Sequence, residues 1–173
     1  MQAIQTVTVG SGGAASITFD SVVGTYTDLY LVCSLRTTAT GDPAAEIFFN
    51  GVTTNRSERS LEGTGSSTRS FSTTQGYFGV INPNGATANT FSSHKIYIPN
   101  YAGGAAKSYS VDSVSENNAT AAYQYTVAGL WNSTAAINEI TIRRHSGTHD
   151  LMEHSTATLY GILAGSDGTT TVT

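Results

Sequence analysis

Apolar and polar residues alternate along most of this chain, and no segment of helix length repeats its apolar residues at helical spacing. The clearest case is the segment 28–36, in which every second residue from Leu29 to Leu35 is apolar and would lie on one face of a strand. Alternation with a period of two is typical of β-strands that are buried on one side. The pattern therefore predicts an all-β protein.

Turn residues divide the chain into about ten such segments. Asn50 and Gly51, for example, form a pair that is strongly favoured in tight turns between strands. The expected strands are residues 4–9, 16–19, 28–36, 46–49, 77–81, 91–98, 108–116, 123–131, 137–144 and 156–163. Because short strands at this spacing without helical crossovers are typical of sandwiches, we expect an antiparallel β-sandwich with jelly-roll connectivity.

The organisation of the chain is expected to be simple. Residues 1–164 are predicted to form a single β-sandwich domain, because neither an internal repeat nor a linker interrupts them. Residues 165–173 are polar and do not alternate, so they are predicted to form a C-terminal tail. Within the domain, residues 55–75 are rich in Ser, Thr, Arg and Gly, and we expect a long irregular excursion with weak edge strands there.

The charge content argues against a nucleic-acid partner, and the length of the apolar runs argues against a membrane. Only 12% of the residues are charged, against about 25% in an average soluble domain. The formal net charge is −4, and the basic residues are scattered, so the chain lacks the cationic stripe that nucleic-acid binding needs. The longest apolar run, residues 29–35, is far shorter than the ~20 residues that span a bilayer. We therefore expect neither a nucleic acid nor a membrane as a partner.

Motifs for catalysis are absent from the sequence. No nucleophile elbow, phosphate loop, dinucleotide loop or calcium loop occurs. Glycoside hydrolysis needs two positioned carboxylates, and the acidic residues form no recognisable pair. The chain is therefore expected to be no enzyme and to use no cofactor.

One short stretch contains three histidines, His145, His149 and His154, together with Asp150 and Glu153. Imidazole and carboxylate groups are ligands for zinc. The spacing places the histidines on a loop and its flanking strands and not on one helical face, which favours solvated or interface side chains. Whether a symmetry axis brings copies of them together around a metal is left open by the sequence.

Three aromatic residues of one expected strand, Tyr123, Tyr125 and Trp131, are candidates for a platform on which sugar rings stack. Aromatic rings are large apolar groups with polarised faces, and Tyr and Trp also offer a polar end. The other interpretation of these residues is that they belong to the core or to a protein interface.

Strand and turn signatures recur along most of the chain. They are SITF at 16–19, YTDL at 26–29, FFNG at 48–51, IPNYA at 98–102, GLWN at 129–132, AAINEI at 135–140 and ATLYGI at 157–162. Together they resemble small all-β structural proteins of tailed bacteriophages. Such proteins are components of the virion surface: capsid decoration (cement) proteins, head fibres, and tail or fibre modules.

The resemblance implies that the chain is a β-sandwich and forms a homotrimer. It also implies that the protein is located on the outer capsid surface of a virion. A chain with room for one sandwich and no shaft fits a decoration protein best, so the expected function is non-enzymatic binding and stabilisation of the major capsid protein. The alternative is a carbohydrate- or receptor-binding β-sandwich module of a phage tail or fibre.

A candidate interface with that partner is formed by Arg56, Arg59 and Arg69, which all lie in the expected excursion at residues 55–75. The planar guanidinium group makes two parallel hydrogen bonds to a carboxylate, and arginine is enriched at protein interfaces. The other interpretation is a solvated loop.

Overall fold

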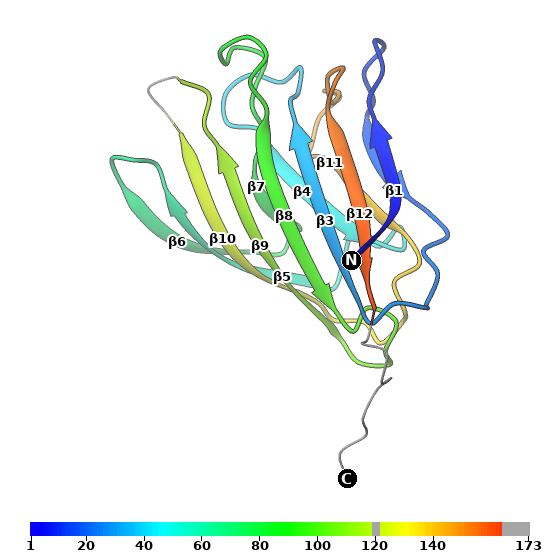
Figure 1. Cartoon of the computed structure of the whole chain (residues 1–173). Coiled ribbons are helices and arrows are strands. Elements are labelled where there is room, and N and C mark those ends of the chain that lie inside the picture. The colour runs from blue at the N-terminus through cyan, green and yellow to red at the C-terminus, as the bar shows by residue number, and fades with distance from the viewer. Residues whose placement is uncertain (119–121, 164–173) are drawn as a thin grey trace.

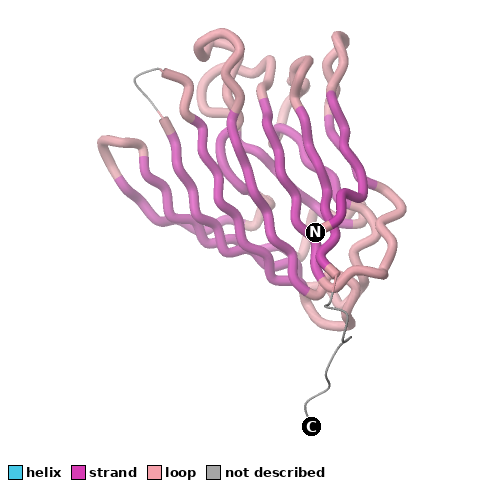
Figure 2. The backbone as a smooth tube through the Cα atoms, in the orientation of Figure 1, coloured by secondary structure: helices cyan, strands magenta, loops and turns pink. Residues whose placement is uncertain are grey.

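The computed structural model describes residues 1–118 and 122–163, and these residues form twelve strands and no helix (Figures 1 and 2). The strands are β1 Gln2–Thr8, β2 Ser16–Phe19, β3 Asp28–Leu35, β4 Ala44–Phe49, β5 Arg56–Gly63, β6 Thr68–Thr73, β7 Tyr77–Val80, β8 Ser92–Pro99, β9 Lys107–Ser115, β10 Tyr123–Trp131, β11 Ile140–Arg144 and β12 Thr156–Ile162. The all-β expectation is confirmed, with twelve strands where about ten were expected. No helix that could cross a membrane occurs in these residues. Residue 164 and the expected tail at 165–173 lie outside them.

The strands form two antiparallel sheets of unequal width, which confirms the expected β-sandwich. The large sheet has eight strands in the order β1-β12-β3-β8-β9-β10-β5-β6, and the small sheet has four in the order β2-β11-β4-β7. Figure 1 shows the large sheet curving across the molecule from β1 to β6. The two sheets differ in width because the hairpins β5–β6 and β9–β10 both extend the same side of the large sheet.

The chain crosses between the two sheets eight times within the described strands. These crossings fall between β1 and β2, β2 and β3, β3 and β4, β4 and β5, β6 and β7, β7 and β8, β10 and β11, and β11 and β12. Jelly-roll connectivity requires crossings of this kind. That finer description of the topology stays a prediction.

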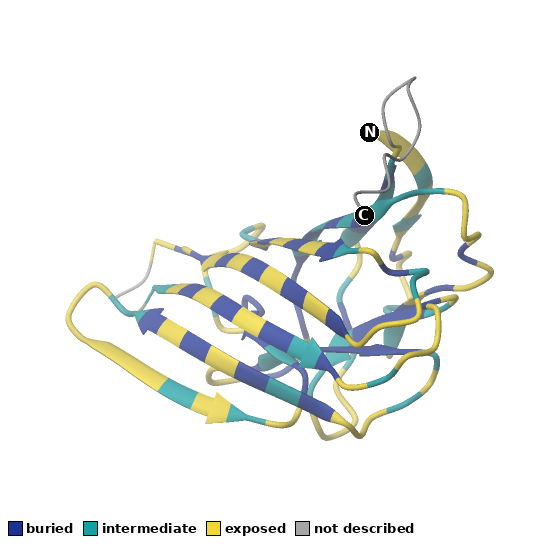
Figure 3. Cartoon of the chain, turned by 90° about the horizontal axis from the view of Figure 1, so that it is seen from below, coloured by how far each residue is buried: buried dark blue, intermediate teal, exposed yellow. Residues whose placement is uncertain are grey.

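Alternating side chains build the core between the sheets, as the banded strands in Figure 3 show. The expected inner face of β3 is confirmed, because Leu29, Leu31 and Leu35 are fully buried. Cys33 is buried on the same face, and burial raises the pKa of its thiol. Each fully buried aliphatic side chain contributes about 1.5–3 kcal/mol to folding.

Residues 55–75 were expected to form an irregular excursion with weak edge strands. The irregular part of this expectation is wrong, because the stretch forms the paired strands β5 and β6, but β6 is an edge strand as expected. The alternation is present there with its polarity inverted. Arg56, Glu58 and Glu62 point inward and are buried, whereas Leu61 points outward and is 63% exposed. A search for alternating apolar residues misses such a strand, although β5 pairs with β10 without a break in register.

Two glycines allow close packing at the side of the core that borders β5. At Gly79 of β7, a side chain would overlap Ser113 of β9, and the φ angle of 142° is one that other residues rarely adopt. At Gly129 of β10, a side chain would overlap the ring of Tyr109. Strand β7, the edge of the small sheet, therefore lies directly on the large sheet.

A histidine is buried in this part of the core. His94 of β8 is fully buried, with Nε2 2.7 Å from Oγ of Ser92 and Nδ1 2.8 Å from Oγ of Ser113. Ser92 donates its hydrogen to the carbonyl of Leu35, so the ring donates from Nε2 and accepts at Nδ1. The neutral imidazole is therefore fully paired, and burial lowers its pKa to about 3.

This histidine predicts a loss of stability in mild acid. Because the pKa is lower in the folded than in the unfolded state, the stabilisation is present above the ordinary histidine pKa of about 6.5 and is lost as the pH falls. When the pH falls from 7 to 5, the unfolded chain takes up a proton at His94 and the folded chain does not. This difference is expected to lower the free energy of unfolding by about 2 kcal/mol. Urea unfolding of the wild type and of His94→Gln at both pH values measures this difference. Parallel losses of stability in the two proteins would contradict it.

Candidate functional site

A groove opens where the small sheet ends and the large sheet continues. Strand β7 packs against β9 and β10, and β5 and β6 extend beyond it. The groove encloses about 540 Å³, which lies within the range of about 300–1,000 Å³ that is typical of ligand sites. Among the residues that line it are Asp42, Ser60, Glu62, Arg69, Phe71, Tyr77, Tyr123 and Tyr125.

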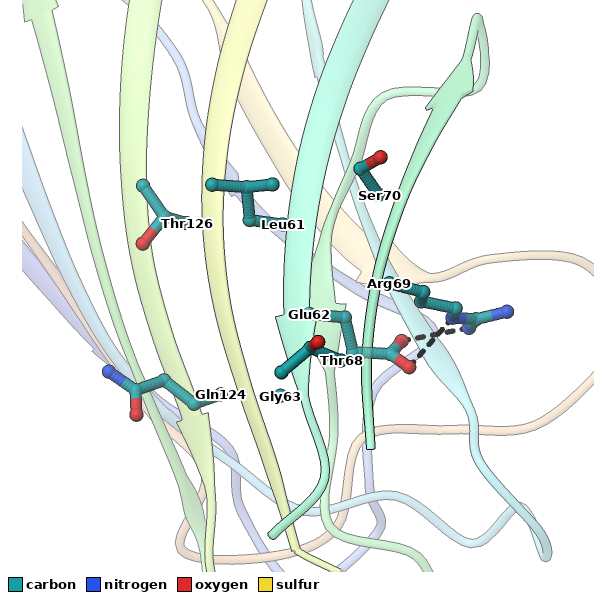
Figure 4. A pocket seen from close by; sticks show the side chains of 8 residues that line it. All are labelled: Leu61, Glu62, Gly63, Thr68, Arg69, Ser70, Gln124 and Thr126. Atoms are coloured by element: carbon teal, nitrogen blue, oxygen red, sulfur yellow. Dashed lines mark hydrogen bonds and ion pairs between the residues drawn. The ribbon is translucent and has the colours of Figure 1, made fainter. Parts of the chain in front are cut away.

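The centre of the groove is an acid–arginine pair that links β5 to β6. Arg69 donates from Nε to Oε1 of Glu62 at 2.7 Å and from Nη2 to Oε2 at 2.8 Å, and Figure 4 shows the two side chains turned toward each other. The side chain of Glu62 is only 4% exposed and that of Arg69 is 64% exposed. Tyr125 also donates its hydroxyl hydrogen to Glu62. The carboxylate is thus held in one orientation at the floor of the groove.

These hydrogen bonds decide the charge state of Glu62. Burial by itself would raise the pKa of this carboxyl group, but the hydrogen bonds from Arg69 and Tyr125 outweigh burial and leave the pKa below its ordinary value. The same contacts raise the pKa of Arg69. Glu62 is therefore an ionised hydrogen-bond acceptor at neutral pH and is unsuited to donate a proton as a general acid.

Three aromatic rings surround this pair. The rings of Tyr123 and Tyr125 are 6.3 Å apart and close to parallel, at 21°. Phe71 meets Tyr125 edge-on at 6.4 Å, and the guanidinium carbon of Arg69 lies 4.9 Å from the centre of the Phe71 ring. Together these residues present flat apolar faces beside fixed polar groups.

A second carboxylate lies at the mouth of the groove. Asp42 precedes β4 and accepts a hydrogen bond from the hydroxyl of Tyr123. Burial and this hydrogen bond raise the pKa of Tyr123 to about 12. The groove therefore has an acceptor at each side of its aromatic rings.

The outer face of the large sheet is a second candidate surface. Tyr160 of β12, Tyr30 of β3 and Tyr97 of β8 are paired directly across the three strands and form a tyrosine row. Tyr97 is 36% exposed and donates to Oδ2 of Asp28 at 2.9 Å. In register with the row, Ser110 and then Ala128 continue the same face.

A hollow on the outer face, shown in Figure 4, surrounds the exposed side chain of Leu61. Thr126 of β10 and Ser70 of β6 are paired with Leu61 and lie beside it. Gln124, Glu62 and Arg69 also line this hollow, and no aromatic ring does. Of the two hollows, the inner groove has the composition that is typical of a binding site.

The structure brings together two of the three aromatic residues that the sequence singled out for sugar stacking. Tyr123 and Tyr125 share the groove. Trp131 does not join them, because it is 2% exposed and packs against Phe49 at 5.6 Å between the ring centres. Trp131 belongs to the core, and Phe71 lies beside the two tyrosines instead.

The three arginines of the expected interface point in different directions. Arg56 is buried, with Nη2 3.1 Å from Oε1 of Glu46 and Nη1 2.9 Å from the carbonyl of Ile47. Arg59 is exposed on the outer face, and Arg69 lies on the inner face. The structure therefore does not bring the three together in one surface.

The carboxylate that holds Arg56 is shared with other residues. Oε2 of Glu46 accepts from Nε of Arg143 at 2.9 Å and lies 3.5 Å from Nδ1 of His145. The ring of His145 also meets Tyr77 edge-on at 4.6 Å. In the described part of the chain, no three side chains of His, Cys, Asp or Glu gather as a metal site would require, so the question of a metal at a symmetry axis stays open.

Among the groove residues that sequence reasoning missed are Asp42, Glu62, Phe71 and Tyr77. Glu62 and Phe71 lie in the stretch that was expected to be irregular. The spacing of Arg56, Glu58 and Glu62 was the available signal, because alternate charged residues in a strand indicate one polar face. No local pattern indicates that Asp42 lies near Tyr123, since the two residues come from opposite sheets.

Searches with this chain against protein-family models, curated proteins and solved structures found no match. Its function must therefore be inferred from the sequence pattern and from the chemistry of its two surfaces.

The contrast between buried Arg56 and exposed Arg59 predicts that the same substitution lowers stability strongly at Arg56 and hardly at all at Arg59. Arg56→Ala removes the partner of Oε1 of Glu46 and of the carbonyl of Ile47, both of them buried, and we expect a loss of about 3 kcal/mol in the free energy of unfolding. Arg59→Ala, the matched control on the outer face, is expected to change it by less than about 0.5 kcal/mol. Urea unfolding measures both values, and equal effects would contradict the assignment of Arg56 as a buried structural residue.

Proposed function

We propose that this chain is a non-enzymatic decoration protein that binds the outer capsid surface of a tailed bacteriophage through the outer face of its large sheet. The observation that carries the proposal is the tyrosine row, Tyr30, Tyr97 and Tyr160, on a face built mainly from hydroxyl and small apolar side chains. Tyrosine is enriched at protein interfaces, and charged residues are depleted from their centres. The strand and turn signatures shared with phage structural proteins support the same function.

The physical requirements of this role match the properties of the face. A sheet is rigid, so a side chain on it loses little conformational freedom when it contacts a partner, and this reduces the cost of binding. Lys95 and Asp112, which are charged residues on the face, pair with each other at 3.7 Å. A decoration protein that touches several capsid subunits at once gains affinity through effective concentration, even where each contact is weak.

The rival function is that of a carbohydrate- or receptor-binding module in a tail or fibre. The two functions differ in stoichiometry, since a decoration protein covers the head. A copy number in purified virions that scales with the major capsid protein supports decoration. A copy number that matches the tail components overturns it.

Binding to capsids from which the protein has been stripped tests the docking face directly. Tyr97→Ala removes an exposed ring from the face, and we expect binding at least about tenfold weaker, as for a residue that dominates an interface. Tyr123→Phe, on the opposite face of the same sheet, is the matched control and should bind like the wild type. Wild-type binding by Tyr97→Ala, or equal losses in both variants, would count against docking through this face.

We further propose that the protein is a homotrimer in solution, as the family resemblance implies. Nine Tyr, six Phe and one Trp are many aromatic residues for one small sandwich, and part of them remains outside the core. Light scattering is expected to give about three times the chain mass of 18.0 kDa. A stable species of 18.0 kDa at micromolar concentration would exclude the trimer.

A further inference from the structure

We propose that the groove between β7 and the hairpin β5–β6 binds a neutral saccharide. The groove is distinct from the outer face that is assigned above to the capsid, and it lies on the other side of the large sheet. This inference does not depend on capsid binding and applies equally if the chain belongs to a tail. Failure of one proposal therefore leaves the other intact.

The aromatic side chains provide the first part of the argument. Tyr123 is half-buried, and its ring is nearly parallel to that of Tyr125. The face of an aromatic ring carries partial negative charge, and the C–H bonds on one face of a pyranose carry partial positive charge. A sugar ring can thus lie flat against Tyr123 with favourable electrostatics and with burial of apolar area on both sides.

The polar groups provide the second part, because their free positions suit hydroxyl groups. Arg69 donates hydrogen bonds from Nε and Nη2 to Glu62. The two hydrogens on Nη1 can be donated to a ligand. Asp42 accepts one hydrogen bond from Tyr123 and has further acceptor positions. A sugar hydroxyl both donates and accepts, so vicinal hydroxyls can bridge from Arg69 to an acceptor such as Asp42.

The groups are also fixed before a ligand arrives. Glu62 holds the guanidinium by two hydrogen bonds, and the ring of Phe71 lies against it. Binding therefore does not need to order Arg69, which would otherwise cost conformational entropy. A site with a few fixed polar groups and several aromatic walls is the composition expected for specific small-ligand binding.

The net charge of the groove determines which class of saccharide it favours. Of the residues that line the groove, Arg69 is positive, whereas Glu62 and Asp42 are negative, so the site has a formal charge of −1 with both carboxyl groups ionised. A uronate, a phosphorylated sugar or a nucleic acid would bring more negative charge against Asp42. The groove therefore favours neutral sugars over acidic ones.

The same carboxylates favour binding over hydrolysis. A glycosidase needs one carboxyl group that stays protonated and one that stays ionised. Glu62 accepts hydrogen bonds from Arg69 and Tyr125, which keep its pKa below the ordinary value. A carboxylate held ionised by these hydrogen bonds is a poor general acid for a glycosidic oxygen, and the saccharide is expected to be released unchanged.

The test uses the full-length chain on an array of bacterial oligosaccharides that includes neutral and uronate-containing glycans. Binding to at least one neutral class is expected, and the tightest neutral glycan is then titrated by calorimetry. Tyr123→Ala removes the stacking face and is expected to weaken binding at least tenfold. Tyr97→Ala, which removes a tyrosine from the outer face of the same sheet, is the matched control and should leave the affinity unchanged.

A second variant keeps the test valid if Tyr123→Ala does not fold, as judged by circular dichroism and urea unfolding. Asp42 precedes β4. The substitution Asp42→Asn removes one negative charge from the groove and leaves its aromatic rings in place. This substitution is expected to reduce the ratio of the affinity for neutral glycans to the affinity for uronate-containing glycans. The proposal is overturned if no neutral glycan is bound, if uronates are preferred by the wild type, or if folded groove variants bind as the wild type does.

Discussion

The small sheet has four strands and cannot cover all eight strands of the large sheet. This difference in width determines where the core is apolar and where it is polar. Where β2, β11, β4 and β7 face the large sheet, the inward side chains are apolar and form an ordinary core. Toward β5 and β6 the cover ends, and the inward side chains become charged. A wholly apolar inner face there would expose a hydrophobic patch, whereas the polar face produces a groove.

The inward charges of β5 are stable because each has partners. Arg56 pairs with Glu46 of the small sheet, Glu58 accepts a hydrogen bond from Tyr109 at 3.1 Å, and Glu62 pairs with Arg69. Burial raises the pKa of Glu58, so burial disfavours its ionised form despite the hydrogen bonds that it accepts. A buried ion pair adds little net stability, but losing one partner is costly. These pairs therefore act mainly to specify how the hairpin β5–β6 docks, which in turn fixes the walls of the groove.

The width of the large sheet also separates two surfaces that suit different partners. The outer face is hydroxyl-rich with a row of tyrosines, a residue type enriched at protein interfaces, and the inner groove is concave with fixed polar groups, as is typical of small-ligand sites. The large sheet contributes to both surfaces, because alternate residues of a strand point to opposite sides, but the tyrosine row lies on β12, β3 and β8 and the groove is lined by β5, β6 and β10. A protein that docks by one face can thus present the other to its surroundings.

The sequence by itself determined the all-β class, most of the strands and the inward face of the strand at residues 28–36. Leu29, Leu31 and Leu35 were assigned correctly because alternation is a local property that neighbouring residues report. The same reasoning identified Tyr123 and Tyr125 as residues on one face of a strand. It failed at β5, where the buried face is polar and the exposed residue is Leu61.

Only the tertiary structure decided which residues meet across the sheets. Tyr123 and Trp131 belong to one strand and point to the same side, yet one borders the groove and the other is buried against Phe49. What differs is the cover from the small sheet, which reaches Trp131 and stops before Tyr123. The position of that boundary depends on pairing between strands that are distant in the sequence, such as β10 with β5 and β4 with β7. Alternation along one strand contains no information about the width of the sheet that packs against it.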